Sequence, residues 1–192
     1  MSWGLIGDMK HIISGQVLLI LCCIVYLVWW YRGFRPGVYV SRIGGMNGIF
    51  LLITAGLGLA GGVLSLLPIP TVRDYWISPS SIAVIGVVAY IVLLLVTDFL
   101  FHRMVTTELI LIVGWTMLEL VVAGRLYAAG ALENGSFLAV CMVIAAAFLI
   151  SIVLYVAYYR MEEMKAFYAA MVPLVTEAVT MGVLVGIVIA GK

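Results

Sequence analysis

The sequence predicts an all-α integral membrane protein, a bundle of six transmembrane helices joined by short loops. Hydrophobic residues make up 66% of the 192 residues, charged residues only 10%, and the mean hydropathy is +1.26. Apolar runs that approach the ~20 residues needed to cross a bilayer recur along the whole chain. The polar segments between them are too short for an aqueous domain, so we expect a single transmembrane domain over residues 1–192.

The first predicted span, residues 12–31, ends in Trp29, Trp30 and Tyr31, an aromatic belt typical of a membrane interface. The mixed segment before it, which contains Met9, predicts a short amphipathic turn lying on the membrane surface. Three arginines follow the belt, namely Arg32, Arg35 and Arg42. We interpret them as orientation signals, with a lipid-phosphate site as the alternative.

The second predicted span, residues 48–67, is rich in glycine. Gly58 and Gly62 have the spacing that lets two helix backbones approach closely. The pair therefore indicates either helix packing within the chain or a homodimer seam, and both uses remain open at this point.

The later spans begin or bend at recognisable signals. Ser78 before Pro79 fits an N-cap followed by a first-turn proline, which starts the third span. Pro173 lacks a backbone N–H and is expected to kink the last span. The four later spans are predicted over residues 80–101, 107–123, 136–158 and 166–190.

Lysine and arginine are unevenly divided between the two sides of this arrangement. The larger group follows spans one, three and five and comprises Arg32, Arg35, Arg42, Arg103, Arg160 and Lys165. The smaller group on the other side comprises Lys10, Arg73, Arg125 and Lys192. Because cytoplasmic loops carry the excess of these residues, both termini are predicted to lie outside a plasma (inner) membrane.

Two acidic residues are predicted to lie deep in the membrane. Glu119 follows Glu108 by eleven residues, which at about 1.5 Å per residue places it about 16 Å from that end of its helix. Glu177 follows Lys165 by twelve residues, about 18 Å in from the same side. Two carboxylates at one level in hydrocarbon are too costly to ionise together unless a cation lies between them. We therefore predict a pair that exchanges a proton for a cation or a small cationic substrate.

A shallower pair is predicted to relay protons toward these acids. Asp98 and His102 are one helical turn apart, so they share a helix face and are able to hydrogen-bond. Arg103 follows directly. Histidine suits a relay because its side chain titrates near neutral pH. The structural alternative is that His102 and Arg103 simply complement the negative end of a helix dipole.

Aromatic and hydroxyl side chains are expected beside the deep acids. Trp115 lies one turn before Glu119, where an aromatic face suits an organic cation. Thr176 and Thr180 flank Glu177 and add oxygen atoms near its carboxyl group. The structural alternative is that Trp115 packs against another helix and that protonated glutamates hold the bundle together by hydrogen bonds.

We weigh three functional classes. The first is a small transporter or channel-like protein that handles protons, cations or a small cationic substrate at the deep carboxylates. The second is a non-catalytic membrane sensor, scaffold or subunit of a larger complex, whose acids pair with cations on another chain. The third, an intramembrane enzyme acting on lipid, is disfavoured because the chain has two histidines and lacks the motifs of hydrolases.

Composition also limits the expected partners. Cys22, Cys23 and Cys141 lie within apolar runs without metal-ligand spacing, so we expect no metal and no cofactor. A net charge of +1 gives no basic surface, so nucleic acid is not expected. The partners we predict are the lipid bilayer, a proton or small cation, and a second copy of the chain through Gly58 and Gly62.

Overall fold

Each long apolar run folds into a helix. The computed structural model describes residues 3–37, 45–99 and 107–190, which contain helices and no strand. Within these ranges six helical stretches are long and apolar enough to cross a membrane, so the predicted all-α, multi-pass fold is confirmed. The elements are α1 (Trp3–Phe34), α2 (Met46–Leu66), α3 (Pro79–Phe99), α4 (Thr107–Ala128), α5 (Asn134–Ala157), the 3₁₀ turn η1 (Tyr158–Arg160), α6 (Glu163–Ala169) and α7 (Val172–Ala190).

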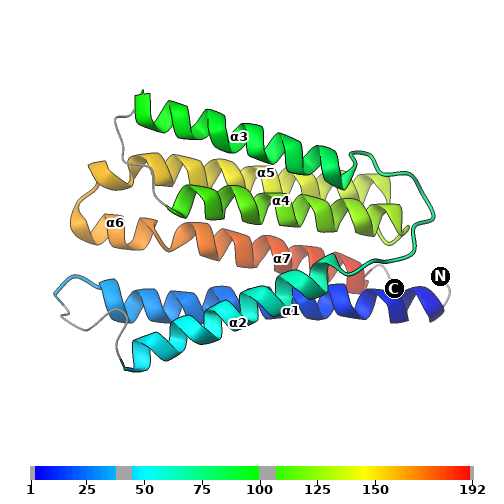
Figure 1. The fold of residues 1–192 in the computed structure, drawn as a ribbon, viewed down its shortest axis with the longest axis horizontal. Helices are drawn as coiled ribbons and strands as arrows, with labels where there is room; N and C mark the ends of the chain where they lie inside the picture. Colours follow the sequence, from blue (N-terminus) through cyan, green and yellow to red (C-terminus); the bar gives the residue numbers. More distant parts are fainter. Residues whose placement is uncertain (1–2, 38–44, 100–106, 191–192) are drawn as a thin grey trace.

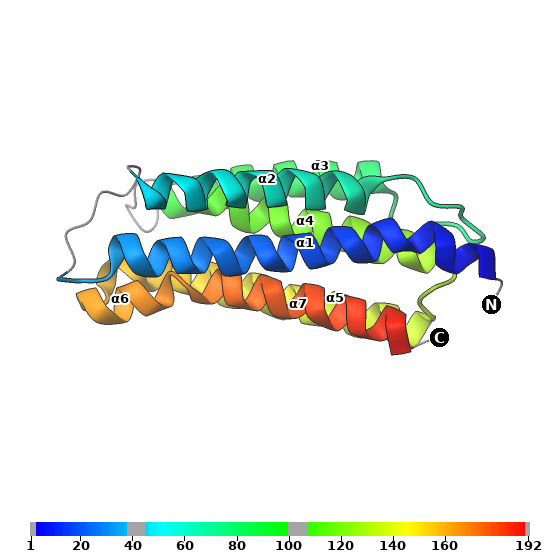
Figure 2. The same ribbon diagram turned by 90° about the horizontal axis from the view of Figure 1, so that it is seen from below.

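The helices lie along the long axis of the molecule (Figures 1 and 2). Both chain termini lie at one end, which we call the terminal end, and α6 lies at the opposite end, which we call the α6 end (Figure 1). Helix α1 begins at the terminal end and α7 finishes there, as an even number of crossings requires.

Packing places two helices at the outside of the bundle. α1 packs along α2 and α7, α5 packs against both α4 and α7, and α3 packs on α4. α2 and α3 are therefore the outermost helices on the two sides, while α4 and α7 come together in the middle (Figure 1).

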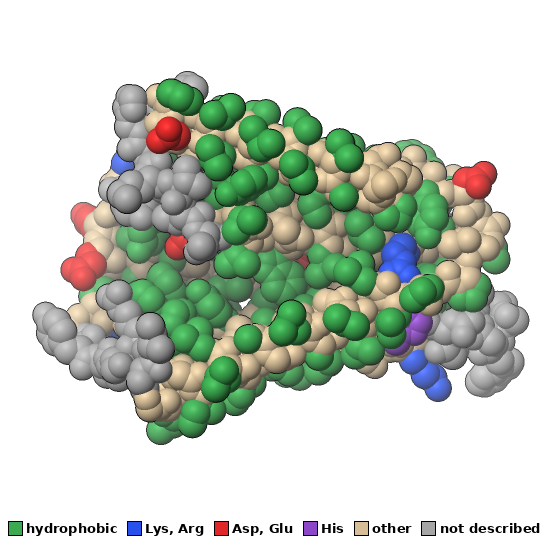
Figure 3. Space-filling view, in the orientation of Figure 1, with side chains coloured by type: hydrophobic (Ala, Val, Ile, Leu, Met, Phe, Trp, Pro, Cys, Tyr) green, Lys and Arg blue, Asp and Glu red, His purple; other side chains and the backbone are tan. Residues whose placement is uncertain are grey.

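The outer surface is that of a protein surrounded by lipid. Hydrophobic side chains cover the length of the visible face, and acidic side chains are found near its two ends (Figure 3). Leu52 of α2 is 75% exposed and Leu149 of α5 is 62% exposed, which is favourable in hydrocarbon and unfavourable in water. The chain thus presents the lipid-facing surface expected of a membrane protein.

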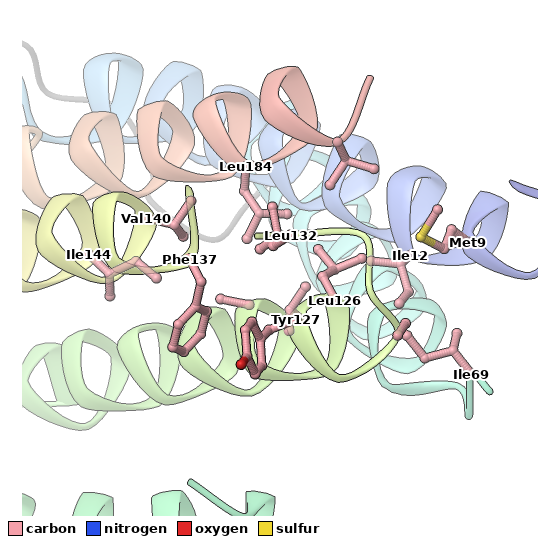
Figure 4. Close-up of a cluster of buried hydrophobic side chains, with 14 residues drawn as sticks. Met9, Ile12, Ile69, Leu126, Tyr127, Leu132, Phe137, Val140, Ile144 and Leu184 are labelled. Atoms are coloured by element: carbon pink, nitrogen blue, oxygen red, sulfur yellow. The ribbon is translucent and has the colours of Figure 1, made fainter. Parts of the chain in front are cut away.

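The main hydrophobic core fills the terminal end. Met9 and Ile12 of α1 meet Leu126 and Leu132 near the end of α4, with Ile69 from the loop after α2 beside them (Figure 4). The α5 and α7 side chains Phe137, Val140, Ile144 and Leu184 complete this cluster (Figure 4). The dense packing closes this half of the bundle.

The contact between α1 and α2 is a close approach of two backbones. A Cβ atom at Gly15 would lie 2.8 Å from the carbonyl oxygen of Gly61, and one at Gly61 would lie 2.9 Å from that of Gly15. Beside them the buried amide of Gln16 donates to Oγ of Ser65 at 3.1 Å. Small residues and a buried hydrogen bond therefore hold these helices together.

Of the glycine pair singled out in the sequence, only Gly58 faces α1. A Cβ atom at Gly58 would lie 3.4 Å from Sγ of Cys22, whereas one at Gly62 would meet nothing within 4 Å. The close contact within the chain is thus made by Gly61, and a homodimer seam through Gly58 and Gly62 stays a prediction.

Helix α4 continues past the predicted boundary at residue 123 to Ala128, and Arg125 is buried instead of marking the interface. Its guanidinium donates hydrogen bonds to the carbonyl oxygens of Ser65, at 3.1 Å, and of Leu67. These carbonyls end α2, where the helix dipole is negative and no intrahelical donor remains. Arg125 is therefore buried because it caps another helix.

The prediction of a surface turn at the N-terminus is wrong for Met9. Helix α1 begins at Trp3, not near residue 12, and the Met9 side chain is only 1% exposed. It packs in the core at the terminal end because the loop after α2 and the end of α4 cover it. The apolar side chain is buried by protein, so it has no reason to lie on the membrane surface.

The last predicted span, residues 166–190, is broken into α6 and α7. Helix α6 ends at Ala169, and α7 begins at Val172, directly before Pro173. Proline donates no hydrogen bond to the residue four positions earlier, Ala169, and its ring crowds that carbonyl. The predicted kink at Pro173 is thus a full interruption at residues 170–171.

The remaining boundaries differ from the predictions by a few residues. The N-cap prediction for α3 is confirmed, since the Ser81 amide donates to Oγ of Ser78 at 3.1 Å. Helix α5 begins at Asn134, not at residue 136, because the preceding turn is made earlier by Gly130, with φ of +73°. Glycine adopts this left-handed conformation without steric strain.

Candidate functional site

Two glutamates meet in the middle of the bundle, where α4 and α7 come together. Glu119 of α4 is 1% exposed and Glu177 of α7 is 3% exposed. Their carboxyl groups are close enough to interact directly with each other. The shared depth inferred from helical rise therefore corresponds to a side-by-side arrangement within one chain.

Thr180 links the two acidic positions. One turn after Glu177, its hydroxyl is placed to donate to Oε1 of Glu119 and to the backbone carbonyl of Glu177 at 2.8 Å. A hydroxyl carries one proton, so these two acceptors share it. Thr180 thereby fixes the height of α7 against α4 at the level of the carboxyl groups.

Most of the carboxyl oxygens at this level have no hydrogen bond from the described residues. These are Oε2 of Glu119 and both side-chain oxygens of Glu177. Buried carboxylate oxygens without donors are unfavourable, because desolvation is not compensated. These oxygen atoms are able to accept a proton shared between the two acids or to bind a cation beside Glu177.

A cavity of about 250 Å³ lies in the half of the bundle toward α6 and is lined by Glu177. Its walls come from the second half of α1, the first half of α4, the end of α5 and the beginning of α7, with Thr54 of α2 at one side. Figure 3 shows the molecule hollowed between α2 and α4 on this side. Glu177 lines the cavity, and Glu119 does not.

The bundle is therefore asymmetric along its long axis. The cavity occupies the half toward α6, and the core around Leu126, Leu132 and Leu184 fills the other half (Figure 4). The acidic pair lies at the boundary between them.

Comparison with protein-family models, with curated proteins and with solved structures found no match. The chain is a multi-pass membrane protein.

The other residues predicted for the site are placed as follows. Trp115 is half-buried and lines the cavity. Thr176 donates to the carbonyl oxygen of Pro173 at 2.8 Å and lies 3.5 Å from Oγ of Ser151, so it joins α7 to α5 and does not line the cavity. Asp98 is exposed near the end of α3 and is not brought to the deep acids.

Two residues of the predicted relay, His102 and Arg103, lie outside the described residues. The relay through Asp98 and His102 therefore stays a prediction.

The structure adds residues that sequence reasoning did not place in the site. Glu108 lies in the first turn of α4, as its spacing predicted, and it also lines the cavity. Four aromatic residues outside α4 line it as well: Tyr26, Trp30, Tyr155 and Tyr158. The one available signal was that the predicted topology puts all four at the same end of the bundle as Glu108.

The site lacks the side chains of a metal centre. Among the residues that the structure describes, no three His, Cys, Asp or Glu side chains are grouped closely enough to hold a metal ion. The chemistry available at Glu119 and Glu177 is proton transfer and charge pairing.

Proposed function

We propose that this protein transports protons or cations across the membrane, including small cationic substrates, with Glu119 and Glu177 as the exchanging groups. The observation that carries the proposal is the buried pair of carboxyl groups, one of which lines a cavity in the half of the bundle toward α6. Intramembrane acids are costly unless they are neutral or paired, which is why they often mark a transport path.

The exchange follows from electrostatics. Two adjacent carboxylates without a cation repel each other in a low dielectric, so the empty pair retains at least one proton. When a cation reaches Glu177, the O–H bond of one carboxylic acid breaks, the proton leaves through the cavity, and the carboxylate pairs with the cation. Charge at the pair is then unchanged, and no electron transfer is involved.

The asymmetry of the bundle supports an alternating mechanism. The cavity lies in the half of the bundle toward α6 and is lined by Glu177, while packed side chains fill the terminal end. The interruption between α6 and α7 lies next to the cavity wall formed by Ala169, Ala170 and Pro173. We place the movement that changes access at this interruption, because no continuous helix there resists bending.

The alternative function, a scaffold or complex subunit whose acids pair with cations on another chain, is weakened by burial. Both glutamates lie inside this chain, at 1% and 3% exposure, so a cation on a neighbouring protein has no direct approach to them. A lipid-facing partner remains compatible with the exposed apolar faces of α2 and α3, but it does not explain the acids.

The excess of arginine and lysine assigns the α6 end to the cytoplasmic side of a plasma membrane in this proposal. Labelling of single cysteines introduced at Glu133, at the terminal end, and at Glu162, at the α6 end, tests this orientation. Both side chains are exposed, and we expect only the first to react with an impermeant reagent added outside cells.

The experiment that tests transport is cation-driven proton flux in proteoliposomes. We compare the wild-type protein with Glu119→Gln, Glu177→Gln and the matched control Glu163→Gln, an exposed acid at the start of α6. Glutamine keeps the shape and removes the exchangeable proton, so each deep variant is expected to lower flux at least tenfold while the control keeps it. Wild-type flux that persists unchanged in both deep variants would contradict the proposal.

A further inference from the structure

The cavity beside Glu177 has an aromatic wall. Of the described residues that line it, five are aromatic and come from four different elements. They are Tyr26 and Trp30 of α1, Trp115 of α4, Tyr155 of α5 and Tyr158 of η1. The faces of such rings carry partial negative charge, and together they favour a cation with apolar substituents.

The charged groups among the described residues of the cavity lining have one sign. Glu177 lies at its inner end and Glu108 in the first turn of α4, and the described lining contains no lysine, arginine or histidine. Glu177 is 3% exposed, and neither of its carboxyl oxygens has a hydrogen-bond partner among the described residues. A ligand that brings positive charge to this point satisfies the carboxylate, whereas an anion is repelled.

The size of the cavity separates organic from inorganic cations. Its 250 Å³ equals the volume of roughly eight water molecules in the liquid, far more than a bare metal ion occupies. Apart from Glu108, Glu177, the aromatic hydroxyl and indole groups, the Thr54 hydroxyl and the Cys22 thiol, the described lining is apolar. Since the last two groups donate to backbone carbonyls, the lining offers few oxygen ligands in place of the hydration shell of a metal ion. An amine with hydrocarbon groups fills such a space and removes its own apolar surface from water.

We propose that this cavity binds a small lipophilic organic cation, a quaternary or protonated amine, with its nitrogen near Glu177 and its apolar groups against Trp115 and Trp30. This proposal rests on the proposed transport function only for the movement of the bound cation across the membrane. Glu177 neutralises the charge of the cation. Trp115, four residues before Glu119 in the sequence, supplies a ring face. Glu108, at the α6 end of α4, attracts the cation into the cavity.

The test is equilibrium binding of benzyltrimethylammonium to the purified full-length protein in lipid nanodiscs, measured by titration calorimetry. Benzyl alcohol, which keeps the ring and lacks the charge, and sodium serve as comparison ligands. We expect saturable binding of the ammonium compound, with at least tenfold weaker binding of the alcohol and no competition by sodium at equal concentration.

Variants locate the binding site. Glu177→Gln and Trp115→Leu are each expected to weaken binding about tenfold, and Glu108→Gln a few-fold. The matched controls are Glu163→Gln and Trp76→Leu, whose side chains are exposed outside the cavity, and these should bind as the wild type does. Glu108 is half-buried at the start of its helix, so its variant keeps the test valid if a deeper substitution disturbs folding.

The outcomes separate this inference from the transport proposal. Equal binding of benzyl alcohol, or unchanged affinity in the Glu177, Trp115 and Glu108 variants, overturns the organic-cation site even if proton flux depends on the two deep acids. Site-dependent binding without any flux in proteoliposomes supports the site and contradicts transport.

Discussion

Thr180 of α7 donates a hydrogen bond to Oε1 of Glu119 on α4 and lies one turn from Glu177. The Thr180 side chain therefore contacts the carboxyl group of Glu119 and belongs to the same helical turn as Glu177. Movement of α7 relative to α4 at this level changes the environment of both carboxyl groups together. This coupling makes Thr180 the residue most sensitive to the proposed exchange after the acids themselves.

Removing this hydroxyl should affect both stability and transport. Thr180→Val keeps the shape but leaves Oε1 of Glu119 without its donor, which we expect to lower the free energy of unfolding by about 1 kcal/mol. Thr180→Ser retains the donor and is the matched control. Thermal unfolding in detergent and proton flux in proteoliposomes measure the two effects. Equal stability and flux in both variants would show that the bond between α7 and α4 has no role.

Arg125 should be a structural residue, not part of the exchange. Arg125→Met removes two charge-assisted hydrogen bonds to the carbonyls of Ser65 and Leu67, and we expect a loss of about 2–3 kcal/mol in unfolding free energy. The exposed cation Lys10 at the same end supplies the control, since Lys10→Met should leave stability unchanged. A destabilised Arg125→Met protein that still folds in nanodiscs should keep its cation affinity. A loss of affinity at full stability would place Arg125 in the functional path instead.

The close approach of α1 and α2 should tolerate no methyl group at Gly15. The added Cβ would lie 2.5 Å from Oγ and 2.7 Å from the backbone nitrogen of Ser65, so the helices must separate. We expect Gly15→Ala to lower the unfolding free energy by about 1–3 kcal/mol, as overpacking does. Gly62→Ala is the control, because nothing lies within 4 Å of its Cβ position. Equal melting temperatures for the two variants would contradict the packing of α1 on α2.

The predicted homodimer seam can be examined at the same helix. Gly62→Leu adds bulk on the outer surface of α2 and should dissociate a dimer formed through Gly58 and Gly62, without lowering monomer stability. Gly56→Leu is the control. Gly56 precedes Gly58 by two residues, so its side chain is rotated by about 200° around the helix from that of Gly58. Native mass spectrometry of both proteins from nanodiscs measures the oligomer. A dimer that survives Gly62→Leu uses another surface.

Much of the fold was predictable because it depends on single segments. Hydropathy and length located the six spans, and Ser78 with Pro79 located the start of α3. The depths of Glu119 and Glu177 followed from helical rise, which is fixed by backbone geometry. Pro173 marked the interruption of the last span, although its extent depends on how α6 packs and was not predictable.

The cavity and its lining were not predictable from the sequence. Trp30 belongs to an aromatic belt by its position, yet it lines the cavity because α1 packs beside α7. The position of Tyr155 along α5 indicated only its end of the bundle, since the rotation of α5 about its axis is set by packing with α4 and α7. The role of Arg125 was not predictable either, because it depends on the end of α2 as a partner. Lateral neighbours of membrane helices are set by surface complementarity, which a hydropathy pattern does not encode.

Proton release on cation binding is a direct measure of exchange at Glu119 and Glu177. Benzyltrimethylammonium is added to the purified protein in a lightly buffered solution that contains a pH-sensitive dye, and the protons released are counted per protein. We predict about one proton released per bound cation for the wild-type protein. The Glu119→Gln, Glu177→Gln double variant should release none. Cation binding to the wild type without proton release, or equal release from the double variant, would contradict exchange at these two acids.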